Sequence, residues 1–394
     1  MHVLELTYGA VLVSIIAEFG FDNTTSGVLA NVFALAFGLS ALPVGILADR
    51  MDARKLLILC CFGTAIAAFF VGIAPNIILL GAAMLFLGLS LGIYHPTGTS
   101  YVSRNVSRRS LGFGYQGIGG NLGIALGPVM AGAIAVWLGW RWSYFIFAVP
   151  SLIIGGLIYL SRRNSSSATP GVETTLRSGG NKTPEKKESL RPLILPIFLL
   201  FAAQVMLSFV YRAMVTFLPK YLGEQLTPMF SGLNTQQIAA YSTTFVFIFG
   251  VIGQYLGGFL SERFRHEMLG IVVTLAAIPF MVATAVFTSA PLIVSAAVFA
   301  FFHFAGQPIY NTLVADYSPP SRRGLIFGLY FFFNFGLGSF SATMMGVLAD
   351  RMGLSWVFLA SAICAVVSSV FIAVLYLMTL WKSDRASAVT IPGQ

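Results

Sequence analysis

Charged residues are scarce in this chain of 394 residues: Asp, Glu, Lys and Arg make up 9% of it, while hydrophobic residues make up 57%. A soluble globular domain carries about 25% charged residues, so the composition excludes an ordinary soluble fold. The net charge of +9 would suit nucleic acid only if the basic residues gathered on one solvated face. They do not gather in this way, so we expect lipid as the solvent and no nucleic-acid partner.

Cysteine and enzyme motifs are also lacking. Two of the three cysteines, Cys60 and Cys61, are neighbours in one apolar segment, and Cys364 stands alone in another. That spacing does not suit a metal site, and we expect neither metal nor cofactor. The sequence has no H-E-x-x-H, no Gly-x-x-x-x-Gly-Lys and no paired acids in its apolar segments, so we expect no enzyme. Met1-His2 gives no basic start to a cleavable signal peptide, so the first apolar segment is expected to act as its own insertion signal.

What the chain has instead is a series of long apolar segments. Each is long enough, or nearly so, to cross a ~30 Å hydrocarbon core, which takes about 20 helical residues. Charged residues, Pro, Gly and Asn bound them. The sequence therefore predicts an all-α polytopic membrane protein with twelve transmembrane helices, near residues 3–20, 24–47, 56–74, 77–103, 111–137, 143–160, 192–218, 237–260, 268–288, 291–316, 325–348 and 355–381.

The loops between these helices differ in charge. Nineteen of the 23 basic residues fall on one side of the predicted membrane, and the other side has only Arg141, Lys220 and Arg351. Because Lys and Arg accumulate in cytoplasmic loops, this asymmetry predicts the cell inner membrane with both termini in the cytoplasm. Arg212 remains inside a helix.

Internal repeats predict the domain organisation. Three motifs of the first half recur in the second at offsets equal to within one residue, which indicates two parallel six-helix bundles, residues 1–160 and 192–382. Residues 161–191 lack aromatic residues and have a basic excess, so we expect a flexible cytoplasmic linker, either a solvated tether or one that touches anionic headgroups. Residues 383–394 are expected to form a cytoplasmic tail. The repeated motifs are 45–50 with 258–263, 107–114 with 321–328, and 139–142 with 353–356.

Residues 45–55, Gly-Ile-Leu-Ala-Asp-Arg-Met-Asp-Ala-Arg-Lys, resemble the loop motif G-x-L-a-D-r-x-G-r-[RK] of the major facilitator superfamily, with Asp52 in place of a Gly. The resemblance covers essentially the whole chain and implies that fold. Asp49 is expected to pair with loop arginines or with the positive end of a neighbouring helix. The family role is a latch that closes the cytoplasmic side; the alternative is a membrane-surface anchor of Arg and Lys. The residues assigned to gating are Gly45, Asp49, Arg50, Arg54, Gly258, Glu262 and Arg263.

Residues 123–132, Gly-Ile-Ala-Leu-Gly-Pro-Val-Met-Ala-Gly, are similar to the antiporter motif of the same superfamily. Gly127 and Pro128 are assigned to gating, because small residues four apart allow close helix contact and proline kinks a helix. The resemblance implies proton-driven export; plain helix packing is the alternative. A narrower likeness to the fosmidomycin-resistance branch of drug exporters is carried by residues 94–98, Gln116, residues 119–121 and residues 209–219.

A few ionisable residues fall inside the predicted helices, where they usually mark pathways or proton relays. Glu5 and His95 both lie in the cytoplasmic third of their helices, and the resemblance brings those helices together, so the two are expected to form a reversible proton site. Alternatively, Glu5 reaches the headgroups. Spacing by four puts His303, Gln307 and Asn311 on one helix face, lining a cavity or making hydrogen bonds between helices.

Arg212 is a candidate for holding an anionic substrate group; it would alternatively snorkel outward or pair with Glu18 or Asp22. Asp316 is expected to pair with Arg322 or Arg323. Further hydrogen-bonding groups of a substrate site at the repeat interface are assigned to Tyr94, Gln116, Asn121, Tyr211 and Asn334.

Together these features predict a secondary active transporter, acting as a monomer among membrane lipids. It would export a small amphipathic or anionic molecule by proton antiport and alternating access. A proton-coupled importer or facilitator of a small metabolite is the alternative within transport. A membrane receptor or scaffold without transport is a third possibility, but such a protein would normally carry a sizeable soluble domain.

Overall fold

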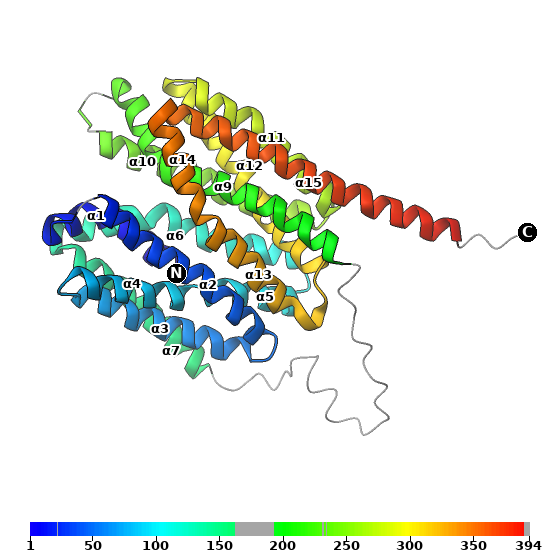
Figure 1. Ribbon diagram of the computed structural model, residues 1–394, viewed down its shortest axis with the longest axis horizontal. Helices are drawn as coiled ribbons and strands as arrows, with labels where there is room; N and C mark the ends of the chain where they lie inside the picture. Colours follow the sequence, from blue (N-terminus) through cyan, green and yellow to red (C-terminus); the bar gives the residue numbers. More distant parts are fainter. Residues whose placement is uncertain (22, 162–192, 231, 234, 390–394) are drawn as a thin grey trace, which may run out of the picture.

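The structure is a computed structural model that describes residues 1–21, 23–161, 193–230, 232–233 and 235–389. Apart from Ser161, the predicted linker lies outside these residues. The described chain is helical throughout its regular parts and forms two adjacent bundles (Figure 1). We call α1 to α7 the first half and α9 to α15 the second half.

Seven helices form the first half as six rods, because α4 and α5 follow one another. They are α1 (His2–Phe19), α2 (Asn23–Ala48), α3 (Ala53–Ile73), α4 (Ile77–Leu91), α5 (Tyr94–Asn105), α6 (Arg109–Leu138) and α7 (Trp140–Leu160).

The second half repeats this plan, with a π-helical turn, η4, joining α13 to α14. Short 3-10 turns, η2 (Thr227–Met229) and η3 (Pro320–Arg322), follow α9 and precede α13. The helices are α9 (Ile194–Leu226), α10 (Thr235–Ser261), α11 (His266–Val286), α12 (Ser289–Asp316), α13 (Arg323–Phe331), η4 (Phe332–Leu337), α14 (Ser339–Met352) and α15 (Leu354–Val389).

Eleven segments of the described chain are long and apolar enough to cross a membrane, and α1 packs beside them against α6. The all-helical fold with twelve rods is thereby confirmed. Large apolar side chains such as Val136 and Trp137, both 84% exposed, cover the outside of the bundle. In a membrane protein these side chains face lipid, so their exposure costs little.

Three predicted boundaries were wrong. The seventh helix, predicted to end at 218, continues to Leu226 through Pro219, because neighbouring membrane helices satisfy the backbone groups that a proline frees. The fourth breaks between Leu91 and Tyr94, since Pro96 has no N–H for the carbonyl of Gly92. The last helix runs on to Val389, into the predicted tail.

Two seams join the halves, and both depend on small residues. In the α2–α13 seam, a Cβ on Gly45 would lie 2.6 Å from Cα of Gly328, and in the α6–α10 seam, a Cβ on Gly258 would lie 2.7 Å from the carbonyl oxygen of Ser110. Real Cβ atoms do not approach backbone this closely, so each seam requires glycine to bring the helix backbones together.

Acidic side chains fasten both seams at the same end of the bundle, which we call the latch end. Asp49 accepts hydrogen bonds from the backbone N–H groups of Gly324 (2.6 Å) and Leu325 (2.8 Å) at the start of α13, and it pairs with Arg104. Glu262 accepts from the N–H of Leu111 (3.3 Å) at the start of α6. A carboxylate at a helix N-terminus is stabilised by the unpaired N–H groups and the helix dipole. The opposite end is called the far end.

Candidate substrate cavity

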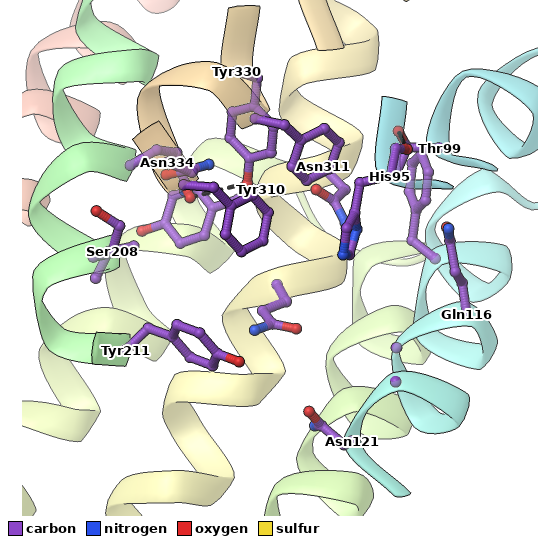
Figure 2. A pocket seen from close by; sticks show the side chains of 18 of the residues that line it. His95, Thr99, Gln116, Asn121, Ser208, Tyr211, Tyr310, Asn311, Tyr330 and Asn334 are labelled. Atoms are coloured by element: carbon purple, nitrogen blue, oxygen red, sulfur yellow. Dashed lines mark hydrogen bonds between the residues drawn. The ribbon is translucent and has the colours of Figure 1, made fainter. Parts of the chain in front are cut away.

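A cavity of about 140 Å³ lies between the two halves (Figure 2). In the view of Figure 2, α5 and α6 of the first half line one side, and α9, α12, α13 and η4 of the second half line the other. All the predicted substrate residues line it, together with His95: Tyr94, Gln116, Asn121, Tyr211, Arg212, His303, Gln307, Asn311 and Asn334.

The polar stripe on α12 faces this cavity. His303, Gln307 and Asn311 all line it, because residues four apart share a helix face. The alternative role, hydrogen bonding between helices, holds for one of them as well: Nε2 of Gln254 on α10 donates to Oε1 of Gln307 at 2.5 Å. His303 itself stacks against Tyr211, with ring centroids 6.2 Å apart and planes 13° apart.

A second polar ladder with the same spacing runs along α9. Gln204, Ser208 and Arg212 all line the cavity, and the guanidinium carbon of Arg212 lies 5.8 Å from the centre of the Phe335 ring. The alternative pairing of Arg212 with Glu18 was wrong, because Glu18 pairs with Arg141 and accepts from the Trp140 indole at 2.7 Å. Asp22 lies outside the described residues.

The charge of the cavity wall is positive. Arg212 is the one Lys or Arg among the described residues that line the cavity, and none of those residues is Asp or Glu. The Glu5 carboxylate beside the cavity pairs with His2 and offsets part of this charge, but the surrounding hydrocarbon keeps the field of Arg212 strong. The wall therefore suits an anion better than a cation.

Glu5 lies in the first third of α1, as the prediction has it, but this part of α1 is beside the cavity and not near the latch end. The reason is that α1 begins beside Gly120 and Gly127, about half-way along α6. The Glu5 carboxylate is 2.8 Å from Nδ1 of His2, and the rings of His2 and His95 are 5.2 Å apart. Glu5 thus reaches His95 through His2, not directly, and it does not extend to the headgroups.

His95 sits among aromatic rings from three other elements. Besides His2, the ring centroids of Phe37, Phe331 and Phe335 lie 5.8, 4.9 and 5.3 Å from that of His95. Phe335 is the same ring that lies against Arg212. One set of contacts therefore links the Glu5 carboxylate of the first half to the guanidinium of the second.

Several lining residues were missed by the sequence reasoning: His2, Thr99, Gln204, Ser208, Gln254, Tyr310 and Tyr330. The spacing of Gln204 and Ser208 from Arg212 is a signal that would have found both. Gln254 had no such signal. Its direction depends on Gly117 across the α6–α10 seam, whose missing side chain leaves room for the amide.

Comparison with known proteins identifies the family. The family model described as Major Facilitator Superfamily matches residues 4–233 and 226–392, which together cover almost the whole chain. The chain belongs to the major facilitator superfamily. It is therefore a multi-pass membrane transporter of a small molecule and not an enzyme.

Relatives and fold neighbours within the superfamily agree. The chain is 27% identical over 378 residues to the fosmidomycin resistance protein of Escherichia coli (strain K12), covering 94% of this chain and 86% of that one. It is 23% identical over 408 residues to the glycerol-3-phosphate transporter of Bacillus subtilis (strain 168), covering 95% and 88%. The crystal structure of the human organic anion transporter MFSD10 has the same fold, with a TM-score of 0.70 at 16% identity over 94% of this chain and 96% of that one.

Several residues assigned to gating in this superfamily member lie at the seams. Gly45, Asp49, Gly258 and Glu262 do so, as described above. Arg263 lies near them, with its guanidinium carbon 4.5 Å from the centre of the Phe259 ring.

Other assigned residues lie away from the seams. Arg50 is exposed, and Arg54 donates to the carbonyls of Ile158 (2.7 Å) and Tyr159 (2.9 Å) at the end of α7. Gly127 packs against Val3 of α1, and Pro128 follows it. The arginine that pairs with Asp49 is Arg104, which lies in the last turn of α5 and not in a loop.

Asp316 and Asp52, two acidic residues at the latch end, were also the subject of sequence predictions. Asp316 pairs with Arg109 of the first half (3.2 Å) and with His266 (2.6 Å), so the prediction of Arg322 or Arg323 was wrong. Asp52, which replaces the family glycine, accepts from the N–H of Arg54 and caps α3 with φ −61°. That ordinary φ explains why glycine is not required there.

Proposed function

We propose that this transporter is a secondary active exporter that moves a small anionic or amphipathic molecule out of the cell in exchange for protons. The observation that carries the proposal is the cavity between the two halves, whose wall has Arg212 as its cation. A central site at the repeat interface, exposed in turn to each side as the halves rock, is how transporters of repeated architecture work.

An anionic substrate group is supported by the chemistry of Arg212. A guanidinium presents a planar set of donors that matches carboxylate and phosphate oxygens. The glycerol-3-phosphate transporter, similar over 95% of this chain, bears the name of an anionic substrate. The aromatic residues Phe331, Phe335 and Phe113 in the same wall suit an apolar part of the molecule.

Proton coupling is assigned to Glu5 and His95, with His2 between them. Ionisable groups are costly inside a membrane and are retained where they serve transport. The contacts from His95 through Phe335 to Arg212 connect the two halves. Through them, protonation of Glu5 or His95 in the first half would change the affinity of Arg212 in the second half for an anion. The likeness to the fosmidomycin resistance protein and the Gly127-Pro128 motif support export.

Gating is assigned to the two seams. We assign the latch end and the C-terminus to the cytoplasm, with the protein in the inner membrane, because Lys and Arg accumulate in cytoplasmic loops. The predicted cytoplasmic N-terminus does not match the fold, since Met1 precedes α1, which begins about half-way along α6 inside the bundle. The Asp49 and Glu262 contacts then hold the cytoplasmic side closed, and substrate would leave the cavity toward the far end. A monomer suffices, because each chain contains a complete cavity.

Import is the second candidate. The relative named glycerol-3-phosphate transporter is named for a metabolite and not for drug resistance, and a cavity alone does not determine the direction of transport. Inverted membrane vesicles with an acidic lumen separate the two. Antiport predicts that a labelled organic anion accumulates in the lumen while a lumenal dye reports proton loss. Accumulation that is indifferent to the pH gradient, or that requires an alkaline lumen, would refute antiport.

A further inference from the structure

In the described structure, Oε1 of Gln116, a partly buried residue of the cavity wall, lacks a hydrogen-bond partner, and so do polar atoms of three amide groups on buried residues of the same wall. These three atoms are Nδ2 of Asn121, Nε2 of Gln204 and Oε1 of Gln254. Their residues are 2%, 7% and 1% exposed, and all three line the cavity. A buried polar atom left unpaired is destabilising, so three in one cavity wall point to a ligand that pairs with them.

Two of these groups lie together on the α6–α10 side of the cavity. Gln254 of α10 occupies the space beside Gly117 of α6, and Asn121 follows Gly117 by about one helical turn, so both amides lie along the same face of α6. In Figure 2, Asn121 and Gln116 extend from α6 toward the cavity from the side opposite Tyr211. The other amide of this cluster, Gln307, is already bonded to Gln254.

The third group lies across the cavity. Oε1 of Gln204 accepts from the hydroxyl of Tyr330 at 3.0 Å, which leaves its Nε2 free. Gln204 precedes Arg212 by eight residues on α9, a rise of about 12 Å toward the latch end. The guanidinium and this amide therefore lie at different depths of one cavity.

We propose that the substrate is a hydroxylated organic anion: its anionic group binds Arg212, and its hydroxyl groups bind Asn121, Gln204 and Gln254. This inference rests on the proposed function and names its substrate class. We call the three amides the hydroxyl subsite.

Hydroxyl groups suit this subsite because a hydroxyl both donates and accepts. It donates to Oε1 of Gln254 and accepts from Nδ2 of Asn121 or Nε2 of Gln204, and it still fits if an amide is turned over. An ammonium group would lie in a wall that has Arg212 and no acid among its described residues. A purely apolar tail would leave all three amides unpaired, and a site built for hydroxyls rejects such an analogue strongly.

The test uses the purified full-length protein and six-carbon probes that differ by one feature each. Gluconate has the anion and the hydroxyls, hexanoate has the anion alone, and sorbitol has the hydroxyls alone. Glycerol 2-phosphate and isopropyl phosphate form a second matched pair with a different anionic group. Isothermal titration calorimetry is expected to give a Kd at least tenfold lower for the hydroxylated anion of each pair than for its hydroxyl-free partner.

Variants connect the preference to the residues. Asn121→Leu and Gln254→Leu are expected to reduce the preference for the hydroxylated anion of each pair to about one. Asn105→Leu removes an exposed amide at the end of α5 and is the matched control. Asn121→Leu should fold at least as well as the natural protein, because it removes an unpaired donor.

The outcomes separate this inference from the proposed function. Equal binding of hydroxylated and hydroxyl-free anions, with a loss in Arg212→Gln, overturns the hydroxyl subsite and leaves anion transport standing. Binding of sorbitol as tight as that of gluconate, with no effect of Arg212→Gln, contradicts the anionic substrate itself. Absence of binding by both hydroxylated anions also overturns the inference.

Discussion

The side chain of Gln254, on α10, lies in the space that Gly117 of α6 leaves free. The amide is 1% exposed, bonds Gln307 within its own half and lines the cavity. A single residue of the second half is thus part of the cavity wall and also fills a notch in the first half. When the α6–α10 seam closes, the side chain of Gln254 therefore also takes its place in the polar wall of the cavity.

Gly258→Ala is expected to weaken closure of the latch end, because the new Cβ would lie 2.7 Å from the carbonyl oxygen of Ser110, a backbone atom of α6. Spin labels at Met51 and Phe264, exposed latch-end positions of the two halves, would report the distance between halves by pulsed electron resonance. We expect a longer or broader distribution. Gly119→Ala is the matched control, since a Cβ there meets nothing within 4 Å; equal distributions for the two variants would contradict the prediction.

Asp49→Asn is expected to open the same end more strongly. It removes the charge that faces Arg104 and the N-terminus of α13, and hydrogen bonds to a charged group contribute about 1.5–3 kcal/mol. The ratio of closed to open protein should fall by roughly tenfold or more, measured with the same pair of labels. Asp52→Asn, in the same loop but capping α3 within the first half, should leave the ratio unchanged. A shift in both variants would point to a general loss of loop structure instead.

Arg54→Ala is expected to lower stability without opening the latch. Its guanidinium binds carbonyls at the end of α7, and losing charged hydrogen bonds of this kind costs about 2 kcal/mol. Thermal unfolding in detergent measures the cost, and the Met51–Phe264 distance should stay as in the natural protein. If that distance changes as in Asp49→Asn, Arg54 belongs to the gate as its sequence motif predicts.

Arg212→Gln is expected to weaken binding of an anionic probe on the order of a hundredfold, because truncating one side of a buried charge pair costs about 2–5 kcal/mol. Arg212→Lys should restore little of this, since a lysine lacks the planar fork of donors and is more strongly hydrated. Calorimetric titration of gluconate measures both variants. Lys220→Gln removes an exposed cation paired with Glu224 and should bind like the natural protein, whereas full rescue by lysine would show that charge alone matters.

The fold was predictable because lipid imposes simple rules. Long apolar segments and one-sided basic loops predicted the helices, and the repeats predicted the two halves. Two helix boundaries were wrong because the effect of a proline depends on its surroundings: the helix continues through Pro219 but breaks before Pro96. Spacing by four also placed His303, Gln307 and Asn311 correctly on one face. Such periodicity depends only on the geometry of a single helix, so it can be read from a short stretch of sequence.

Contacts between helices could not be read in the same way. Gln254 lines the cavity because Gly117, far away in sequence, leaves it room. Asp316 meets Arg109 rather than its neighbours Arg322 and Arg323, because the end of α12 lies against the start of α6. The depth of Glu5 likewise depends on where α1 lies along α6. Each case requires the packing of two segments that no spacing within one segment reveals.

The latch contacts are made largely to backbone groups, the N–H of Gly324, Leu325 and Leu111, and this has a consequence for adaptation. New substrates can be acquired by exchanging cavity side chains while the machinery of closure stays intact. Selection for transport of different compounds should therefore recover different cavity substitutions, whereas a seam substitution should slow every compound by a similar factor. Gln254 belongs to both sets, so its replacement should alter turnover and preference together.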